Sequence, residues 1–292
     1  MTESLLFPAR VPRLDIAGRA AGARISPPAM AAGAEVWRDT GGAVFAYCRA
    51  EAGQYWMDLP GLATFCFDGD GNQVAASPSP GVAPDTVVEA YWHSALPLVL
   101  QARGAEVLHA SAVRTPRGVA AFCGASGSGK STIAYGLHRR GYGLWADDAV
   151  ALDMSQAGIG AVPLAFDVRL RPASAAFFGL GAEAARLTGA GDSGGRVGWA
   201  PVPLVAVCVI DRGSRAFGDA ALTRLRPSTA FPAVLAHAFC FSLQDLGRKR
   251  LMLDRYLGLV ARVPVFELGF GEGLAGLAAV LDAIERAIGA GD

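Results

Sequence analysis

The chain has 292 residues with 26 basic and 26 acidic side chains, so its formal net charge at neutral pH is zero. That balance argues against nucleic acid as a partner, because a nucleic-acid footprint needs an excess of Lys and Arg. Hydrophobic residues make up 52% of the chain, which is enough for one large domain or two modest ones.

The apolar segments are too short for a membrane span. The longest, 200–210, contains Pro201 and Pro203 and falls well short of the roughly 20 residues that a bilayer needs. The first 15 residues lack the basic head and apolar core of a secretory signal. Five widely spaced cysteines without a CxxC pair indicate buried thiols in a reducing compartment. We therefore expect a cytoplasmic protein with no membrane partner.

The first part of the chain has strand-like composition. Short apolar runs separated by turn residues fill 34–77, and DGDGN at 68–72 is typical of a hairpin turn. Asp85 then follows a proline-rich stretch and can cap a helix. We predict a small β-rich region with a linker helix over 1–95 and a catalytic domain over 96–292.

Beyond residue 104 the pattern changes to alternating strands and helices. This alternation is typical of an α/β nucleotide-binding core. The predicted strands are 106–113, 118–124, 142–152 and 203–213, and the predicted helices are 130–141, 227–246 and 273–289.

The segment CGASGSGKST, residues 123–132, carries the strongest motif. It fits G-x-x-x-x-G-K-[ST] in full, between a predicted strand and a predicted helix. In such a P-loop the backbone N–H groups form an anion nest, and the helix N-terminus adds partial positive charge. The motif predicts that a nucleoside triphosphate is bound by Gly124, Ala125, Ser126, Gly127, Ser128, Gly129, Lys130, Ser131 and Thr132.

Two side chains of this loop have individual roles. Lys130 is one of two lysines among the 26 basic residues, and a compact ammonium fits inside the nest where a guanidinium would not. Lys130 is expected to reach the β- and γ-phosphates and the Ser131 hydroxyl to bind Mg²⁺. The expected cofactors are therefore ATP and Mg²⁺. A chance Gly/Ser turn is the alternative, and the strand–helix context disfavours it.

Asp147 and Asp148 follow the next predicted strand. If that strand lies beside the loop strand, its carboxyl end brings both acids to the phosphates. Adjacent residues of a strand point to opposite sides, so one carboxylate could face the metal and the other an acceptor hydroxyl. Their proximity also raises one pKa, which suits a general base. An ordinary solvated strand end is the alternative to this catalytic interpretation of Asp147 and Asp148.

His109 lies on an apolar predicted strand. By itself, this position indicates a core residue rather than a catalytic one.

The stretch LHASAV…GVAAFCGASGSGKSTIAYGLHRRGYGLWADDAV resembles the catalytic core of the HPr kinase/phosphorylase family. A histidine strand, the loop, a helix ending in a basic-Gly pair and a strand ending in Ala-Asp-Asp follow in the family's order. The resemblance implies a P-loop core of HPr kinase type. It further implies that Asp147 is the general base on a serine hydroxyl, that Asp148 and Ser131 support Mg²⁺, and that His109 lines the active site.

The sequence also departs from that family. Bifunctional members carry an acidic-x-Arg-Gly signature, whereas FDVRLRP keeps Asp167 and Arg169 without the glycine. Asp167 could still assist the metal and Arg169 could clamp phosphate; a surface ion pair is the equal alternative. The chain resembles more closely the smaller HPr-kinase-like proteins of peptide-modification systems, including kinases that phosphorylate the terminal serine of lasso-peptide precursors.

Two segments are candidates for binding an acceptor. Residues 187–201 contain five glycines and form either a mobile active-site loop or a linker, with Arg196 available for a phosphate or peptide carboxylate. The basic cluster 247–250, which includes Arg248, could hold a peptide C-terminus; solvated surface is the alternative.

The leading interpretation is an ATP-dependent serine kinase for a peptide or small protein, and a homo-oligomer is compatible with it. HPr protein is the second candidate acceptor. Two further alternatives stay open: a kinase for a small-molecule hydroxyl, and a nucleotide-dependent switch. The paired aspartates argue against a switch, because a switch must place water and has less use for a base aimed at an alcohol.

Overall fold

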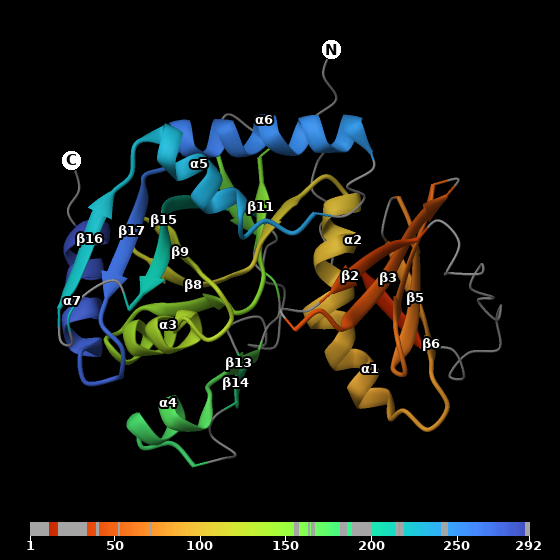
Figure 1. Ribbon diagram of the computed structural model, residues 1–292, viewed down its shortest axis with the longest axis horizontal. Helices are drawn as coiled ribbons and strands as arrows, with labels where there is room; N and C mark the ends of the chain where they lie inside the picture. Colours follow the sequence, from red (N-terminus) through yellow and green to blue (C-terminus); the bar gives the residue numbers. More distant parts are fainter. Residues whose placement is uncertain are drawn as a thin grey trace. The chain divides into compact units, whose positions relative to one another are not determined.

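The described part of the protein, a computed structural model, forms two compact units (Figure 1). One contains the described residues within Phe7–Ala105 and Phe239–Arg250, and the other those within Glu106–Ala238 and Leu251–Asp292. The division at residue 95 expected from the sequence stays a prediction. The structure describes residues 12–16, 34–38, 41–51, 53–69, 72–154, 158–162, 164, 167–181, 186–188, 200–213, 216, 219–240 and 245–289.

The first unit contains a six-stranded sheet in the order β1-β6-β5-β4-β3-β2. Neighbours from β2 to β6 are antiparallel, whereas β1 pairs with β6 in parallel. The strands expected within 34–77 are therefore present. Their bounds are β1 Arg13–Ile16, β2 Glu35–Arg38, β3 Val44–Glu51, β4 Gln54–Leu59, β5 Ala63–Asp68 and β6 Gln73–Pro78.

One helical segment packs on this sheet. It consists of α1 (Pro84–Ala90), a π-helical turn η1 (Tyr91–Ala95) and α2 (Leu96–Ala102). The helix begins at Pro84, where the missing N–H and fixed φ of proline are tolerated, one residue before the expected cap. The Tyr91 ring lies 6.4 Å from that of Phe65, so the core of this unit lies between helix and sheet.

The second unit contains a nine-stranded mixed sheet with β15 at its centre. Most of β15 runs parallel to β9 and β17, while its first residues pair antiparallel with β12. Beyond β9 the order is β9-β8-β10, and beyond β12 it is β12-β11-β7. The bounds are β7 Glu106–Leu108, β8 Ala110–Thr115, β9 Gly118–Cys123, β10 Gly143–Ala146, β11 Val150–Asp153, β12 Gly160–Val162, β15 Val202–Arg212, β16 Ala220–Arg224 and β17 Val265–Phe270.

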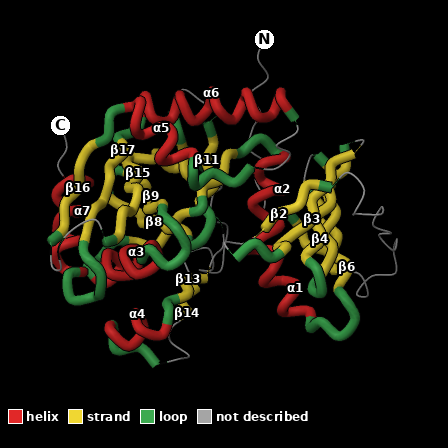
Figure 2. The backbone as a smooth tube through the Cα atoms, viewed as in Figure 1, coloured by secondary structure: helices red, strands yellow, loops and turns green. Residues whose placement is uncertain are grey.

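Helices lie on both faces of this sheet (Figures 1 and 2). On one face, α3 (Lys130–Arg139) and α7 (Leu277–Gly289) bury an apolar cluster that includes Phe122 and Ile284. The helices approach closely at Gly136, where an added Cβ would lie 2.9 Å from Leu281 Cδ1. The remaining helices are α4 (Pro172–Phe177), α5 (Pro227–Leu235) and α6 (Leu246–Arg262).

The structure corrects three of the expected elements. The strands 106–113 and 142–152 are each interrupted, the first at His109 and the second by a turn at Asp147 and Asp148. The helix expected over 227–246 ends at Leu235, because Ala238 forms a β-bridge with Leu108.

Helix α6 and strand β17 were not expected, and the basic cluster 247–250 lies inside α6 rather than between helices. Among the helices that the structure describes, none combines the length and the apolar composition needed to cross a membrane.

Candidate active site

Residues 124–129, here called the glycine loop, connect the carboxyl end of β9 to the start of α3. Gly127 and Gly129 have φ values of +81° and +109°, which side chains rarely tolerate. The loop curls around the buried Lys130 ammonium, which donates hydrogen bonds to the carbonyls of Gly124 at 2.8 Å and Ala125 at 3.1 Å. The cation is thus held inside the loop, as the motif predicts for a phosphate-binding lysine.

His109 connects this lysine to the aspartate turn. Its Nδ1 lies 3.0 Å from the backbone carbonyl of Asp148, and its Nε2 lies 3.1 Å from the Lys130 ammonium. Because a carbonyl can only accept, Nδ1 must carry the proton, and Nε2 accepts from the ammonium. Burial, and then the Lys130 charge, lower the pKa of His109, which favours this neutral form.

The two aspartates have different surroundings, although not because they alternate on a strand. They occupy the turn between β10 and β11, where Asp148 has a φ of +62°. Asp147 is buried and accepts hydrogen bonds from the hydroxyls of Ser131, at 2.9 Å, and Ser111. Asp148 instead lines the cavity in front of the glycine loop.

Their strand is not the immediate neighbour of the loop strand. β10 pairs with β8, and β8 pairs with β9, so one strand lies between them. The turn that follows β10 nevertheless brings Asp147 within hydrogen-bond distance of Ser131, the residue after the loop lysine.

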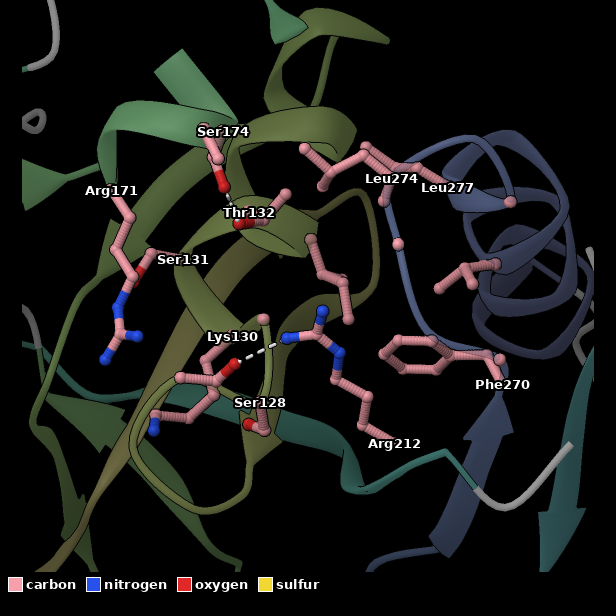
Figure 3. A pocket seen from close by; sticks show the side chains of 18 of the residues that line it. Ser128, Lys130, Ser131, Thr132, Arg171, Ser174, Arg212, Phe270, Leu274 and Leu277 are labelled. Carbon is pink, nitrogen blue, oxygen red and sulfur yellow. Dashed lines mark hydrogen bonds between the residues drawn. The ribbon is translucent and has the colours of Figure 1, made fainter. Parts of the chain in front are cut away.

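Two arginines lie against the tip of the glycine loop. Arg212 Nη1 donates to the Gly127 carbonyl at 2.9 Å, and an added Cβ on Gly127 would lie 2.9 Å from Arg171 Nη1. Arg171 directly precedes α4, which a 2.8 Å hydrogen bond between Ser174 and Thr132 attaches to α3 (Figure 3).

Neither arginine was singled out as a site residue from the sequence. A signal existed for Arg212, because it ends β15, and β15 runs parallel to the loop strand β9. Side chains at the carboxyl ends of neighbouring parallel strands meet at one edge of a sheet. For Arg171 the sequence gave no comparable signal, although it lies two residues after Arg169 in the segment FDVRLRP.

A cavity of about 360 Å³ lies in front of the loop. We call the side lined by His109, Lys130 and Asp148 its polar end. The opposite side, which we call the apolar end, is lined by Phe270, Leu274, Leu277 and Val280 (Figure 3). Of the predicted phosphate-binding residues, those that line the cavity are Ser126, Gly127, Ser128, Gly129, Lys130, Ser131 and Thr132.

Ser128, in the glycine loop, has a buried hydroxyl that lies against Gly124. Its residue is 9% exposed, and its Oγ has no hydrogen-bond partner within the described part of the chain. A buried hydroxyl without a partner carries a desolvation penalty, which a bound acceptor such as a phosphate oxygen would remove.

The residues also fit the requirements of magnesium. Mg²⁺ in phosphoryl-transfer sites is held by one or two protein oxygens together with substrate phosphates. Ser131 and Asp147 place one hydroxyl and one carboxylate side by side. No group of three or more His, Cys, Asp or Glu side chains that could hold a metal alone occurs in the part of the chain that the structure describes.

The other predicted site residues are Asp167, Arg169, Arg196 and Arg248. Asp167 and Arg169 lie in β13 (Asp167–Arg169), whose backbone pairs with β14 (Arg186–Thr188), and their roles stay predictions. Arg248 lies in the first turns of α6 and belongs to the other compact unit; its backbone N–H donates to Asp245 Oδ1. Arg196 lies outside the described residues.

Comparison with known proteins gives partial likenesses among solved structures and none among sequences. No protein-family model matches the sequence, and no curated protein sequence matches it. Among solved structures, the chain is similar to the HPr(Ser) kinase/phosphatase from Coxiella burnetii. The identity is 10%, the match covers 62% of this chain and 89% of that one, and the TM-score is 0.34.

Proposed function

We propose that the protein is an ATP- and Mg²⁺-dependent kinase that transfers the γ-phosphoryl group to a serine hydroxyl. One observation supports this most strongly. A single cavity holds a loop-bound ammonium, Lys130, and a carboxylate, Asp148, beside a hydroxyl–carboxylate pair formed by Ser131 and Asp147. These are the parts that phosphoryl transfer requires: a phosphate cradle, a metal site and a base.

The glycine loop binds the triphosphate in this proposal. The Lys130 ammonium, which donates to the carbonyls of Gly124 and Ala125, turns toward the β- and γ-phosphates when they enter. The unpartnered Ser128 hydroxyl and the N-terminal N–H groups of α3 add neutral donors. The two carbonyls keep the ammonium beside the loop before the nucleotide arrives, and phosphate oxygens then replace protein acceptors.

Asp147 and Ser131 hold Mg²⁺ in this proposal. Asp147 is buried and accepts a hydrogen bond from the Ser131 hydroxyl, which lines the cavity, so the pair could offer the metal one carboxylate and one hydroxyl oxygen. Bound there, Mg²⁺ would neutralise part of the negative charge that develops on the phosphates.

Asp148 is then the general base. It faces the cavity, so its carboxylate can accept the proton of a serine hydroxyl as that oxygen attacks the γ-phosphorus. The new P–O bond forms as the bond to the β–γ bridging oxygen breaks, and ADP leaves with the negative charge. The family resemblance implied the reverse assignment, with Asp147 as base and Asp148 at the metal; the contacts of the two carboxylates favour the exchange.

Arg171 and Arg212 supply positive charge at the loop tip. Both are exposed, both lie within hydrogen-bond range of the glycine loop, and both line the cavity. Guanidinium groups in this position can stabilise the charge of the transferring group, because their planar donors match phosphate oxygens.

The charge of the chain bears on the kind of acceptor. A neutral chain with scattered arginines has no broad field to attract an acidic protein, so recognition is expected to be local. We favour a peptide with serine near its end, of the kind found in lasso-peptide precursors. Its proposed contacts are those expected from the sequence, either residues 187–201 with Arg196 or, as a separate possibility, Arg248.

A transfer assay tests the proposal. The purified protein is incubated with Mg²⁺, γ-labelled ATP and a peptide that ends in serine, with the same peptide ending in alanine as the control. HPr protein and a small hydroxyl compound serve as further acceptors. Label is expected on the serine peptide and absent from the alanine peptide. Release of free phosphate alone, with every acceptor, would show that the protein is not a kinase for them and would favour a nucleotide switch.

A further inference from the structure

Four apolar side chains of the cavity lining have no part in the proposed chemistry. Phe270 ends β17, Leu274 lies in the connection that follows, and Leu277 and Val280 lie in the first turns of α7. Three of these side chains are buried, while Leu274 is half-buried. Phe270, Leu277 and Val280 belong to the apolar cluster that α3 and α7 bury, and the parts of them that line the cavity can contact an apolar part of a ligand.

We infer that this apolar end binds the nucleobase of the triphosphate, an inference that rests on the proposed function. The apolar end adjoins the phosphate cradle directly, because a Cβ added to Gly129 would lie 3.9 Å from the Phe270 ring atom Cζ. The two ends of one ligand can therefore occupy the two ends of one cavity. A volume of about 360 Å³ falls within the range of small-molecule sites, roughly 300–1,000 Å³.

The position of Asp148 indicates whether the apolar end binds the nucleobase or a side chain of the acceptor. The acceptor hydroxyl must reach the γ-phosphoryl beside Asp148, at the polar end. A ribose and base attached through the α-phosphate leave the cradle away from the γ-phosphoryl, toward the other end. The apolar end is therefore on the nucleoside side of the loop.

Arg212 provides a second surface for a flat ring. Figure 3 shows its guanidinium between Lys130 and Phe270 in that view, fixed by the hydrogen bond to the Gly127 carbonyl. A planar guanidinium stacks on aromatic rings, so a base can lie between Arg212 and the apolar wall.

The connection between β17 and α7 leaves room for the edge of the base. Gly271, Gly273 and Gly276 line the cavity without side chains, and Gly273 has a φ of +89° that favours glycine. Backbone N–H and C=O groups can therefore approach a ring edge closely.

The test compares two ligands that share the phosphate chain and differ in the nucleoside. Binding of ATP and of inorganic tripolyphosphate, each with Mg²⁺, is measured by calorimetry on wild-type protein, Leu274→Ser and Phe270→Leu. Wild-type protein is expected to bind ATP at least about 10-fold more tightly than tripolyphosphate. Both variants are expected to lose about 10-fold in ATP affinity while tripolyphosphate affinity stays within about 2-fold, since a small change in an apolar pocket has roughly this effect.

Leu257→Ser is the matched control, because Leu257 on α6 is 49% exposed and does not line the cavity. It should leave both affinities unchanged. Thermal unfolding of each variant verifies that it folds; Leu274 is half-buried, so Leu274→Ser keeps the test decisive even if Phe270→Leu is unstable.

The measurements separate a failure of the nucleobase site from a failure of the proposed function. Equal wild-type affinity for ATP and tripolyphosphate, or an equal loss of both in Leu274→Ser, would overturn the nucleobase site and leave the phosphate loop intact. Absence of binding by either ligand to wild-type protein would overturn the proposed function itself.

Discussion

The two ends of the cavity differ in how their side chains are held. At the polar end the Lys130 ammonium has three protein partners, one of which, His109, also contacts the aspartate turn. At the apolar end, Phe270 and Leu274 provide apolar surface and carry no side-chain group that could hydrogen-bond to a ligand. Fixed charges act on the developing charge of a transition state, whereas apolar area acts on binding. Substitutions at the polar end should therefore change the rate, and those at the apolar end the affinity.

The largest effect is expected for Asp148→Asn. Removing a positioned base should slow phosphoryl transfer by about 10² to 10⁴-fold, with ATP affinity nearly unchanged. Asn also tolerates positive φ, so the turn should persist. Asp147→Asn should instead raise the Mg²⁺ concentration needed for half-maximal rate. Initial rates across a Mg²⁺ series separate the two roles.

The reverse pattern would restore the assignment implied by the family resemblance. In that case phosphoryl transfer by Asp147→Asn would remain slow at saturating Mg²⁺, whereas saturating Mg²⁺ would restore the transfer rate of Asp148→Asn. Small, equal effects for both variants would remove the aspartates from the mechanism altogether.

Lys130→Met is expected to lower kcat/KM for ATP by about 10² to 10³-fold, because a preorganised donor to the phosphates is lost. Lys130→Arg should not rescue activity, since a planar guanidinium does not fit inside the loop. The control is Lys249→Met, which changes the only other lysine of the chain. Near wild-type turnover by Lys130→Met would show that the loop does not bind the transferred phosphate.

Arg212→Gln is expected to slow transfer by roughly 10 to 100-fold, the effect of losing one hydrogen bond to a charged group. Arg224→Gln, on the exposed end of β16, is the control. Single-turnover rates at saturating ATP measure the effect. A change in KM with an unaltered rate would show that Arg212 contributes to nucleotide binding but not to the charge of the transferring group.

The smallest effect concerns the pH dependence of stability. The pKa of His109 lies below its ordinary value of 6.5 in the folded protein, mainly because the ring is buried. The unfolded chain therefore binds more protons as the pH falls through 6.5, so His109 lowers stability on the acid side. His109→Gln should reduce the loss of Tm between pH 7 and pH 5 by at most a few degrees.

The exposed His138, at the end of α3, supplies the control variant His138→Gln. If Tm fell equally between pH 7 and pH 5 for His109→Gln and wild-type protein, the ring would titrate alike in the folded and the unfolded state. The neutral His109 bridge would then be wrong.

The glycine loop could be predicted because its conformation is encoded locally. Glycines at fixed offsets permit the positive φ values, and a strand and helix of standard composition flank them. The surroundings of the two aspartates could not be predicted, because they depend on a left-handed turn at Asp148 that the strand-like pattern conceals.

Other parts depend on contacts between distant segments. The helix expected over 227–246 stops early because Ala238 pairs with Leu108, more than a hundred positions away. The apolar end combines a strand end, a connection and a helix that share no local motif. Tertiary packing, rather than local propensity, therefore determines where this helix ends and which residues form the apolar end.

The bridge through His109 has a thermodynamic consequence. One ring nitrogen is held by Lys130 and the other holds the Asp148 backbone. When phosphates draw the ammonium away, the ring loses a donor, and the constraint on the aspartate turn changes with it. Nucleotide and acceptor are then linked ligands, and linkage is reciprocal. An acceptor that contacts Asp148 must alter ATP affinity by the same factor as ATP alters acceptor affinity, so the two substrates should bind cooperatively rather than independently.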